Sequence, residues 1–377
     1  MPGPALPLLA SHRTSLETCV YCPKLCRGAC PVSNVEASET VIPWGKMSTA
    51  YFALRGDVPL DRGHAATAWA CTSCYACRDT CEHKNPVADV LMDARAEAFA
   101  KGVAPAPANE LSARWFDRAA ETSEAIDILA TQTDTDRSTL DDAALLIGCG
   151  YARRAPDVAR DAVHATAALT SAKVRPVRAC CGLPLLQAGD REGFLGAAKR
   201  LAAEVARAPK VIVVDPGCAQ TLLVEYARAG VALPKVELFV DLAAQQKSRL
   251  RQLDGTELAD DGSPHRHVRW HDPCQLGRGL GRFEEPRAVL ERVAPGARGF
   301  VRERAAGECS GGGGLLPITR PETSRAIAEQ RIAEHRGAGG GVLVTHCAGS
   351  LHRFRTAGEA AMDLTTLVAR ALRSKGR

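Results

Sequence analysis

The sequence has no apolar run long enough to span a membrane, and it has no long run of basic residues. Its first residues, MPGPALPLLASHR, lack the basic segment and the long apolar stretch of a secretory signal, so we expect a cytoplasmic chain with no transmembrane segment. The net charge of +5 comes from 48 Lys and Arg and 43 Asp and Glu, and it is too small to indicate binding to nucleic acid. The 377 residues, 46% of them hydrophobic, suffice for two or three globular domains.

Several motifs of enzyme chemistry are also absent. We find no dinucleotide fingerprint, no flavin-type motif and no hydrolytic constellation. The glycine-rich run CSGGGG at 309–314 lacks the Lys-Ser/Thr pair of a phosphate-binding P-loop, so close packing around a cluster or a partner cofactor explains it better. The chain therefore has no visible site for removing a hydride from an organic substrate.

Cysteine is abundant instead. Fifteen cysteines in a reducing compartment are not a disulfide framework, so metal binding must account for most of them. Eight lie in two tight runs, CVYCPKLCRGACP at 19–31 and CTSCYACRDTC at 71–81. Triplets at this spacing, each with a trailing fourth cysteine, predict two 4Fe–4S clusters, because three thiolates let one loop curl round a cluster.

The fourth cysteine of such a run usually ligates the other cluster. We therefore predict one cluster on Cys19, Cys22, Cys26 and Cys81, and the other on Cys30, Cys71, Cys74 and Cys77. Structural zinc is the alternative, but zinc usually takes paired C-x2-C ligands. The longer spacing from Cys22 to Cys26, and Glu82 where a proline is usual after the last cysteine, strain this pattern without removing a ligand.

The cluster runs lie among segments with helical patterns. Residues 44–55 place Met47, Ala50, Tyr51 and Leu54 at helical spacing, and residues 85–101 form a second such segment. We therefore expect an all-helical cluster domain, in which Met47, Tyr51 and Trp69 are core residues rather than electron relays. The basic residues that flank the runs would either favour the reduced clusters or be ordinary solvated charges. They are Lys24, Arg27, Arg78 and Lys84.

From residue 143 onward, short apolar runs alternate with Ala-rich helical stretches. This alternation is typical of parallel α/β units. The expected strands are 143–147, 173–177, 211–214, 268–270 and 342–345, and the expected helices are 157–171, 189–207, 285–294 and 321–336.

The remaining seven cysteines reveal an internal repeat. The first copy holds Cys149, Cys180, Cys181 and Cys218, and the second holds Cys274, Cys309 and Cys347. The spacing from Cys181 to Cys218 equals that from Ser310 to Cys347, 37 residues, so Ser310 occupies the position of Cys181. Each cysteine follows a predicted strand or its loop, so a parallel fold would gather them at the carboxyl ends of the strands.

The segments IGCG, ACCGLPLLQAGDREG, DPGCAQT, HDPCQLGR, CSGGGG and VTHCAGS resemble the paired cysteine-rich (CCG) domains of heterodisulfide reductase catalytic subunits. They are equally similar to the iron–sulfur subunits of glycolate oxidase and of anaerobic glycerol-3-phosphate dehydrogenase. In these families a helical ferredoxin domain precedes two CCG domains, and the resemblance covers residues 15–100 and 143–370.

The resemblance implies five thiolates in a complete CCG copy, which can hold a noncubane 4Fe–4S cluster. The first copy has Thr221 in place of the last cysteine, and its four thiolates suffice for an ordinary cluster or for zinc. The second copy has Ser310 and Ser350 in place of cysteines. Its three thiolates could hold a cluster with an open iron, or one with His271 or His346 as the fourth ligand, or no metal; hydrogen bonding beside the site is the favoured role of both histidines.

These observations predict an α+β multidomain protein with an all-helical ferredoxin domain and two α/β CCG repeats with parallel strands. The expected parts are the ferredoxin domain at 1–105, a linker at 106–142, the first CCG domain at 143–245, a linker at 246–264 and a degenerate second CCG domain at 265–377.

The leading functional hypothesis is an iron–sulfur subunit of an oxidoreductase complex. It would pass electrons from a flavoprotein (FAD-linked) dehydrogenase to a quinone or disulfide acceptor, and a partner could hold it at the inner face of the membrane. One alternative is a heterodisulfide reductase-like catalytic subunit that reduces a disulfide at a CCG-bound cluster, against which the missing fifth cysteine argues. Another is a non-catalytic redox sensor or scaffold.

Overall fold

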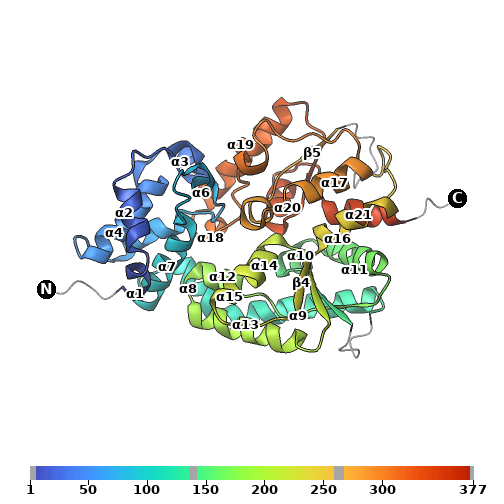
Figure 1. The fold of residues 1–377 in the computed structure, drawn as a ribbon, viewed down its shortest axis with the longest axis horizontal. Coiled ribbons are helices and arrows are strands. Elements are labelled where there is room, and N and C mark those ends of the chain that lie inside the picture. The colour runs from blue at the N-terminus through green and yellow to red at the C-terminus, as the bar shows by residue number, and fades with distance from the viewer. Residues whose placement is uncertain (1–5, 136–141, 259–266, 374–377) are drawn as a thin grey trace. The chain divides into compact units, whose positions relative to one another are not determined.

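The computed structural model describes residues 6–135, 142–258 and 267–373. The chain divides into two compact units (Figure 1). The first unit combines Met1–Trp115 with two later segments, Gly182–Phe194 and Glu308–Arg331, and the second comprises Phe116–Cys181, Leu195–Gly307 and Ile332–Arg377. Two short pieces of the CCG repeats therefore belong to the same unit as the ferredoxin-like cysteine runs.

The described part of the first unit is built from helices and loops, as predicted. Prolines in the first turn start several of these helices, where a missing N–H costs nothing, and Gly56 ends α4 in the left-handed conformation. The elements are α1 (Pro7–Ala10), α2 (Arg13–Val20), η1 (Arg27–Ala29), α3 (Pro31–Glu36), η2 (Glu39–Val41), α4 (Pro43–Arg55), α5 (Arg62–Ala65), η3 (Ala66–Trp69), α6 (Ala76–Thr80), α7 (Val87–Ala100), α8 (Ala106–Ala113), α12 (Leu183–Ala188) and α18 (Leu316–Thr319).

The core of this unit lies between α2, α4 and α7, which pack against one another. The predicted helices 44–55 and 85–101 are found as α4 and α7. Met47, Tyr51 and Trp69 are buried, as the helical spacing predicts. These large side chains fill the space behind the two cysteine runs.

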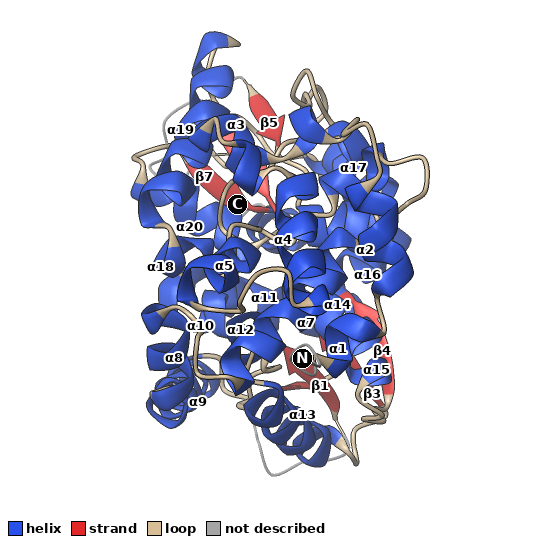
Figure 2. Cartoon of the chain, turned by 90° about the vertical axis from the view of Figure 1, so that its left-hand side faces the viewer, coloured by secondary structure: helices blue, strands red, loops and turns tan. Residues whose placement is uncertain are grey.

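The second unit contains two parallel sheets, and helices still dominate it (Figure 2). The first sheet has the strand order β2-β1-β3-β4, and the second has the order β5-β6-β7. All five predicted strands are present as β1 (Ala143–Leu146), β2 (Val174–Pro176), β3 (Lys210–Val213), β5 (Val268–Trp270) and β6 (Val342–Thr345). Two further strands, β4 (Lys235–Leu238) and β7 (Ala361–Asp363), are too short or too polar to show an apolar run in the sequence.

Helices flank these strands in the alternation that the sequence predicts. The predicted helices are found within two residues of their expected bounds as α11 (Pro156–Thr170), α13 (Arg191–Val205), α17 (Glu284–Val293) and α19 (Pro321–Gly337). The other helices are α9 (Trp115–Gln132), α10 (Cys149–Arg154), α14 (Pro216–Gln220), η4 (Thr221–Glu225), α15 (Tyr226–Arg228), α16 (Phe239–Gln245), η5 (Lys247–Arg249), η6 (Gln275–Gly279), η7 (Arg304–Ala306), α20 (Ala348–Thr356) and α21 (Leu364–Leu372).

Two of these elements, η4 and η6, are π-helical turns, and each follows a motif cysteine within a few residues. Turns of this kind are rare and are frequent at functional sites. Among the described residues, no helix has both the length and the apolar character that a membrane span requires.

The predicted linker at 106–142 contains the helices α8 and α9. Residues 136–141 of this linker, and 259–266 at the end of the second linker, lie outside the described residues. The bounds of the five predicted parts stay a prediction.

Candidate iron–sulfur centres

The first unit gathers Cys19, Cys22, Cys26 and Cys81, which we call the Cys19 quartet. Cys19 lies at the end of α2, and the charges of Cys26, Cys81 and Cys22 all act on its thiol. Burial, together with these neighbours, raises the pKa of Cys19 to about 12, and burial and Cys22 raise the pKa of Cys26 to about 11. The trailing cysteine of the second run has therefore joined the triplet of the first.

The reciprocal set, Cys30, Cys71, Cys74 and Cys77, forms the Cys30 quartet. Burial raises the pKa of Cys77 well above its usual value, and the neighbouring thiols of Cys71, Cys74 and Cys30 add to this effect. The crossed assignment of these eight cysteines as cluster ligands stays a prediction.

The loops of both quartets adopt a backbone conformation that non-glycine residues avoid. Lys24 has a φ of 67°, and Ser73 and Tyr75 have φ values of 55° and 61°. This conformation turns backbone N–H groups toward the sulfurs, since the N–H of Ser73 donates to Cys71 Sγ at 3.3 Å. Strain of about 1–2 kcal/mol per residue is typical of sites whose surroundings hold a functional geometry.

The residues present fit iron–sulfur clusters. Crowded, buried thiols with raised pKa values are unfavourable as free thiolates, and cationic iron would stabilise them in that form. Among the described side chains of His, Cys, Asp and Glu, no three converge in the manner of a single-ion site.

Two polar residues that donate to the quartets are not apparent in the sequence motifs. Lys46, on α4, is 2% exposed, and its Nζ donates to Cys30 Sγ at 3.3 Å. Asn85 is buried, and its Nδ2 donates to Cys19 Sγ at 3.0 Å and to Ser15 O at 2.8 Å. A signal for Lys46 exists, because it is the single charged residue between Trp44 and Leu54, next to Met47 of the buried face.

The four cations singled out from the sequence lie at the surface and have local partners. Lys24 lies 4.0 Å from the centre of the Trp44 ring and, like Arg27, forms an ion pair with Glu39. Arg78 pairs with Asp79 at 3.0 Å, and Lys84 Nζ donates to Asp79 O at 2.7 Å. These contacts favour the interpretation of solvated surface charges.

Arg95 connects the second cysteine run to both CCG segments of the first unit. Its buried guanidinium donates to four backbone carbonyls, and burial lowers its pKa to about 10. The acceptors are Ala68 O at 3.1 Å, Gln187 O at 3.1 Å, Gly314 O at 3.1 Å and Cys71 O at 2.8 Å. Trp69 Nε1 donates to the same Gln187 carbonyl at 3.2 Å.

The glycine-rich run 309–314 packs against the same cysteine loop. A Cβ on Gly314, whose φ is +63°, would lie 2.0 Å from Cys71 O, and a Cβ on Gly313 would lie 2.4 Å from Thr72 O. Only glycine therefore allows this close approach of two backbones. The close packing expected for this run is found, and its partner is the loop of the Cys30 quartet.

In the second unit, the four cysteines of the first CCG copy come together. Cys181 Sγ lies 3.4 Å from Cys218 Sγ, and a hydrogen bond with Cys180 is the largest influence on the thiol of Cys149. The bond with Cys181 lowers the pKa of Cys218, but burial and the charge of Asp215 outweigh it and raise that pKa to about 12. Four soft ligands thus converge after strands β1, β2 and β3.

Gly148 and Asp215 shape this site. Gly148 has a φ of +102°, and a Cβ there would lie 2.9 Å from Asp215 Cβ and 3.4 Å from Cys218 Sγ. Asp215 Oδ1 accepts from Gly217 N at 2.9 Å and from Cys218 N at 3.3 Å. The glycine lets the loop of Cys149 approach, while the carboxylate fixes the loop of Cys218.

The threonine at the position of the missing fifth cysteine has a hydrogen-bond partner. Thr221 is fully buried, and its Oγ1 donates to Gly217 O at 2.7 Å. The hydroxyl is therefore committed to the preceding helical turn of the Cys218 loop.

The three cysteines of the second copy are divided. Cys309 belongs to the first unit, where its sulfur accepts from Gly311 N at 3.3 Å, while Cys274 and Cys347 belong to the second. Cys347 lies near the first copy, because the charge of Asp215 acts on it, and burial, the first cause, raises its pKa to about 12. Metal binding by these three thiols stays a prediction.

The two histidines considered as ligands have other contacts. His346 Nδ1 lies 3.1 Å from Asp363 Oδ1, and the ring of His271 packs edge-on against Phe354 at 5.1 Å. Asp363 also accepts from Tyr151 Oη at 2.5 Å. Burial opposes its ionisation, but the charge of His346 and these hydrogen bonds prevail and lower the pKa of Asp363.

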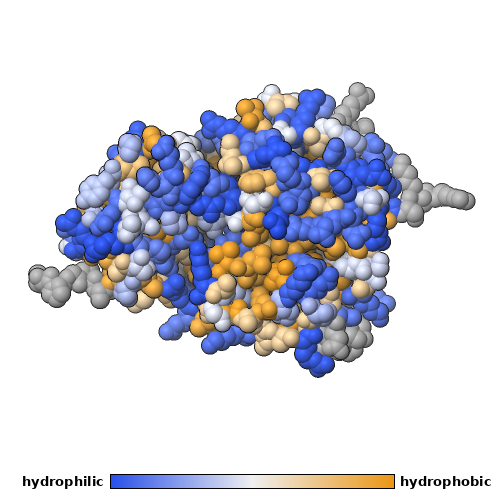
Figure 3. All heavy atoms as spheres, in the orientation of Figure 1, coloured by the Kyte–Doolittle hydropathy of each residue, from blue (hydrophilic) through white to orange (hydrophobic). Residues whose placement is uncertain are grey.

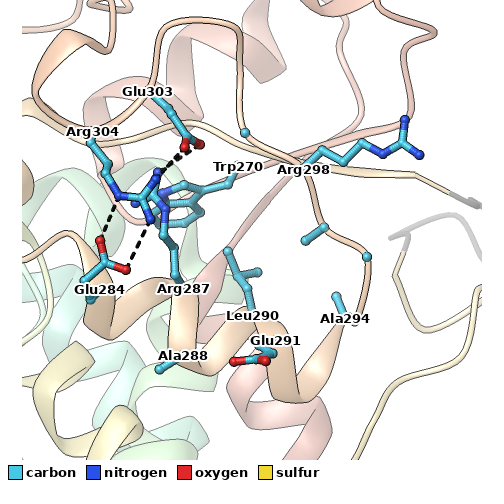
Figure 4. Close-up of a pocket in the computed structure, with 13 residues that line it drawn as sticks. Trp270, Glu284, Arg287, Ala288, Leu290, Glu291, Ala294, Arg298, Glu303 and Arg304 are labelled. Carbon is cyan, nitrogen blue, oxygen red and sulfur yellow. Dashed lines mark hydrogen bonds and ion pairs between the residues drawn. The ribbon is translucent and has the colours of Figure 1, made fainter.

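A pocket of about 460 Å³ lies elsewhere in the second unit, beside α17 (Figure 4). Four of its charged side chains form ion pairs: Arg304 binds Glu284 at 2.8 Å and Arg287 binds Glu303 at 3.3 Å. None of the cysteines lines it, so it is not part of the candidate redox sites. By contrast, apolar residues gather near the middle of the face shown in Figure 3.

Comparison with known families agrees with this geometry. A model described as a 4Fe-4S dicluster domain matches residues 15–85, and a model described as a cysteine-rich domain matches residues 143–222 and 268–355. The chain is therefore an iron–sulfur protein that combines a 4Fe-4S dicluster domain with two cysteine-rich domains. The resemblance predicted from the sequence is confirmed.

Curated relatives share this class. The chain is 25% identical over 342 residues to a subunit of the fumarate reductase (CoM/CoB) of Methanothermobacter marburgensis. The aligned residues cover 88% of this chain and 66% of that protein. It is 31% identical over 184 residues to a subunit of the dihydromethanophenazine:CoB–CoM heterodisulfide reductase of Methanosarcina acetivorans. These aligned residues cover 45% of this chain and 42% of that protein. The match thus spans between about two fifths and two thirds of the length of these relatives.

Proposed function

We propose that this protein is an electron-transfer iron–sulfur subunit of an oxidoreductase complex. It would receive electrons from a flavoprotein dehydrogenase and pass them through the two ferredoxin-type quartets to the first CCG site, and from there to a quinone or disulfide acceptor. The relatives named above are subunits of reductases, which supports this class of function. Association with a membrane through a partner belongs to the same proposal.

The observation that carries the proposal is the contact set of Arg95. One side chain binds the carbonyl of Cys71 and the carbonyls of Gln187 and Gly314, which belong to the two CCG segments of the same unit. Arg95 thus packs the ferredoxin-like loop against the two CCG segments that belong to the same unit. This packing supports a chain in which the two kinds of motif act together.

The chain's own residues would act as follows. The Cys19 and Cys30 quartets would hold one 4Fe–4S cluster each, and Cys149, Cys180, Cys181 and Cys218 would hold a third cluster. Zinc, the alternative for these four thiolates, has no redox chemistry and would end the relay before this site. When bound, such clusters supply one-electron chemistry. Asn85, Lys46 and the N–H of Ser73 would orient individual thiolates.

Direct reduction of a disulfide by this chain alone is less well supported. The hydroxyl of Thr221, at the position of the fifth thiolate, is bonded to Gly217 O. The first site therefore has four thiolates, which favours a relay over the chemistry associated with the complete motif.

The test is to count iron and acid-labile sulfide in the anaerobically purified chain and to record EPR spectra after reduction with dithionite. We expect about twelve irons per chain, as three four-iron clusters require, with one EPR signal lost in Cys181→Ser and Cys218→Ser. Ala219→Ser, which adds a hydroxyl to the same loop without removing a thiolate, is the matched control. About eight irons, unchanged by the cysteine substitutions, would contradict a relay through the CCG site and favour a scaffold.

A second measurement tests the partner. An affinity-tagged chain isolated from its own cells should retain an FAD-containing protein whose substrate reduces the clusters. If low-potential donors reduce the clusters but no copurifying flavoprotein does, that part of the proposal is contradicted.

A further inference from the structure

The two quartets differ in the charge that surrounds their sulfurs. Lys46 is almost completely buried and donates to Cys30 Sγ at 3.3 Å, and the thiols of Cys30, Cys71 and Cys77 are the charged groups that act on it. The guanidinium of Arg95, also buried, donates to Cys71 O of the same loop at 2.8 Å. The Cys30 quartet therefore has two buried cations.

The Cys19 quartet has a neutral donor in the corresponding position. Asn85 Nδ2 donates to Cys19 Sγ at 3.0 Å and carries no charge. The nearby cations are at the surface, because the side chains of Lys24 and Arg27 are 36% and 57% exposed, and both pair with Glu39. Solvent and the carboxylate screen these charges, so they act weakly on the sulfurs.

This difference matters because reduction adds one negative charge to a cluster. A buried cation interacts strongly with that charge, since the low dielectric of the interior does not screen it as water does. A hydrogen bond from a charged donor is also stronger than one from a neutral donor. The reduced form should therefore be favoured more at the Cys30 quartet than at the Cys19 quartet.

We propose that Lys46, supported by Arg95, sets the order of the two reduction potentials, so that the cluster of the Cys30 quartet has the higher potential. This inference rests on the proposed function, because it takes the eight thiolates as ligands of two 4Fe–4S clusters. With both clusters bound, one electron would pass from the cluster held by the Cys19 quartet, which would be oxidised, to the cluster held by the Cys30 quartet, which would be reduced. No bond would form or break, and the reduced flavin of the partner would supply the electron.

Exposure of the two loops agrees with this direction. The Cys19 quartet lies next to Tyr21 and Leu25, which are 76% and 64% exposed and offer a donor protein an apolar contact beside the cysteines. The Cys30 quartet contacts the CCG segments instead, through Arg95 and through the approach of Gly314 to Cys71 O. Electrons would thus enter at the exposed quartet and leave from the one that faces the CCG motifs.

The experiment is an EPR-monitored redox titration of the full chain with both clusters loaded. In Lys46→Met, the midpoint potential of one cluster should become more negative by ~59 mV, which corresponds to a change of about tenfold in the equilibrium constant of its one-electron reduction. The other cluster should stay unchanged, and Lys46→Arg should restore most of the shift because it keeps the charge. Lys24→Met is the matched control, since it removes a lysine from the other loop, and it should shift neither potential comparably.

An unchanged pair of potentials in Lys46→Met, or an equal shift in Lys24→Met, would overturn the proposal. If Lys46→Met fails to hold its cluster, Asn85→Ala shows independently which EPR signal belongs to which quartet, because it perturbs the cluster of the Cys19 quartet alone. The cluster marked by Asn85→Ala must then be the one of lower potential in the wild-type protein, and the opposite order would refute the proposal. Correctly ordered potentials without electron transfer to the CCG site would contradict the proposed function and leave this inference intact.

Discussion

Asp215 Oδ2 accepts a hydrogen bond at 3.0 Å from the backbone N–H of Ala348, and this bond joins the two CCG copies. Asp215 belongs to the loop of Cys218 in the first copy, and Ala348 follows Cys347 in the second. A further contact supports the junction, because a Cβ on Gly150 would lie 2.7 Å from Ala348 Cβ. The second copy thus helps to fix the loop of Cys218 in the first.

The substitution Asp215→Ala tests this junction. It removes three hydrogen bonds from buried N–H groups, so we expect the free energy of unfolding to fall by about 2–4 kcal/mol and the iron assigned to the first CCG site to be lost. Urea unfolding and iron analysis measure the two effects. Asp157→Ala, which removes an exposed carboxylate paired with Arg355 in the same unit, should change stability by less than about 1 kcal/mol. Equal effects of both substitutions would contradict the junction.

The buried pair of His346 and Asp363 predicts a dependence of stability on pH. The pKa of Asp363 is lowered in the folded chain, so its stabilising contribution is fully present above the unfolded pKa, about 3.9, and is lost as the pH falls through the folded value. Asp363→Asn should therefore destabilise the protein by about 3 kcal/mol at neutral pH, and the difference from wild type should shrink below about pH 4. Urea unfolding at a series of pH values measures it.

Tyr151→Phe tests the same dependence of stability on pH. It keeps the ring and removes the hydroxyl that donates to Asp363 Oδ2, so it should raise the pKa of Asp363 and move the loss of stability to higher pH. Asp57→Asn, at an exposed carboxylate of the other unit, should leave the profile unchanged. A constant difference between wild type and Asp363→Asn at every pH would exclude ionised Asp363 as the source.

Gly314→Ala tests the contact between the glycine-rich run and the cysteine loop. A Cβ at this position meets Cys71 O at 2.0 Å and also requires a positive φ, so we expect a loss of about 2–4 kcal/mol. The cluster of the Cys30 quartet should become easier to remove with a chelator. Gly337→Ala, at a helical glycine with open space around it, should be neutral or slightly stabilising. A stable Gly314→Ala variant with normal cluster retention would show that the approach is not required.

Arg95→Met tests the connection between the two kinds of motif. The substitution keeps an apolar stem but leaves four buried carbonyls without their donor, which should cost about 3 kcal/mol or more. We also expect electron transfer from the ferredoxin clusters to the CCG site to slow, as stopped-flow spectroscopy of the reduced chain would measure. Lys101→Met, at the exposed end of α7, is the control and should change neither quantity. Unaltered stability in Arg95→Met would refute this account of the contact.

Much of the fold could be predicted from local patterns. The strands of 143–147 and 342–345 are short, continuous apolar runs, because they are buried on both faces, and this pattern is unambiguous. β7 was not predicted, because three residues are too few to show a periodic pattern, although Asp363 at its end takes part in a buried hydrogen-bond network. The cysteine groupings were accessible for the same local reason, because ligand spacing along a loop follows from the size of a cluster.

The residues that tune the sites could not be predicted in this way. Lys46 and Asn85 act on cysteines 16 and 66 residues away in the chain, and nothing in their own neighbourhood shows that they approach a sulfur. Gly314 lies more than two hundred residues from the loop it packs against. Sequence reasoning found that this run required close packing, but it could not name the partner.

Local patterns in the sequence were enough to identify the side chains that can bind metal, the alternation of strands and helices, and the repeat of the CCG motif, because each of these is a property of neighbours along the chain. The three-dimensional fold was needed to show that a buried lysine faces one quartet and a neutral amide faces the other, and that Arg95 binds loops from three distant segments. These relations depend on which surfaces pack together, and the free energy of that packing is shared among many residues that no local pattern records.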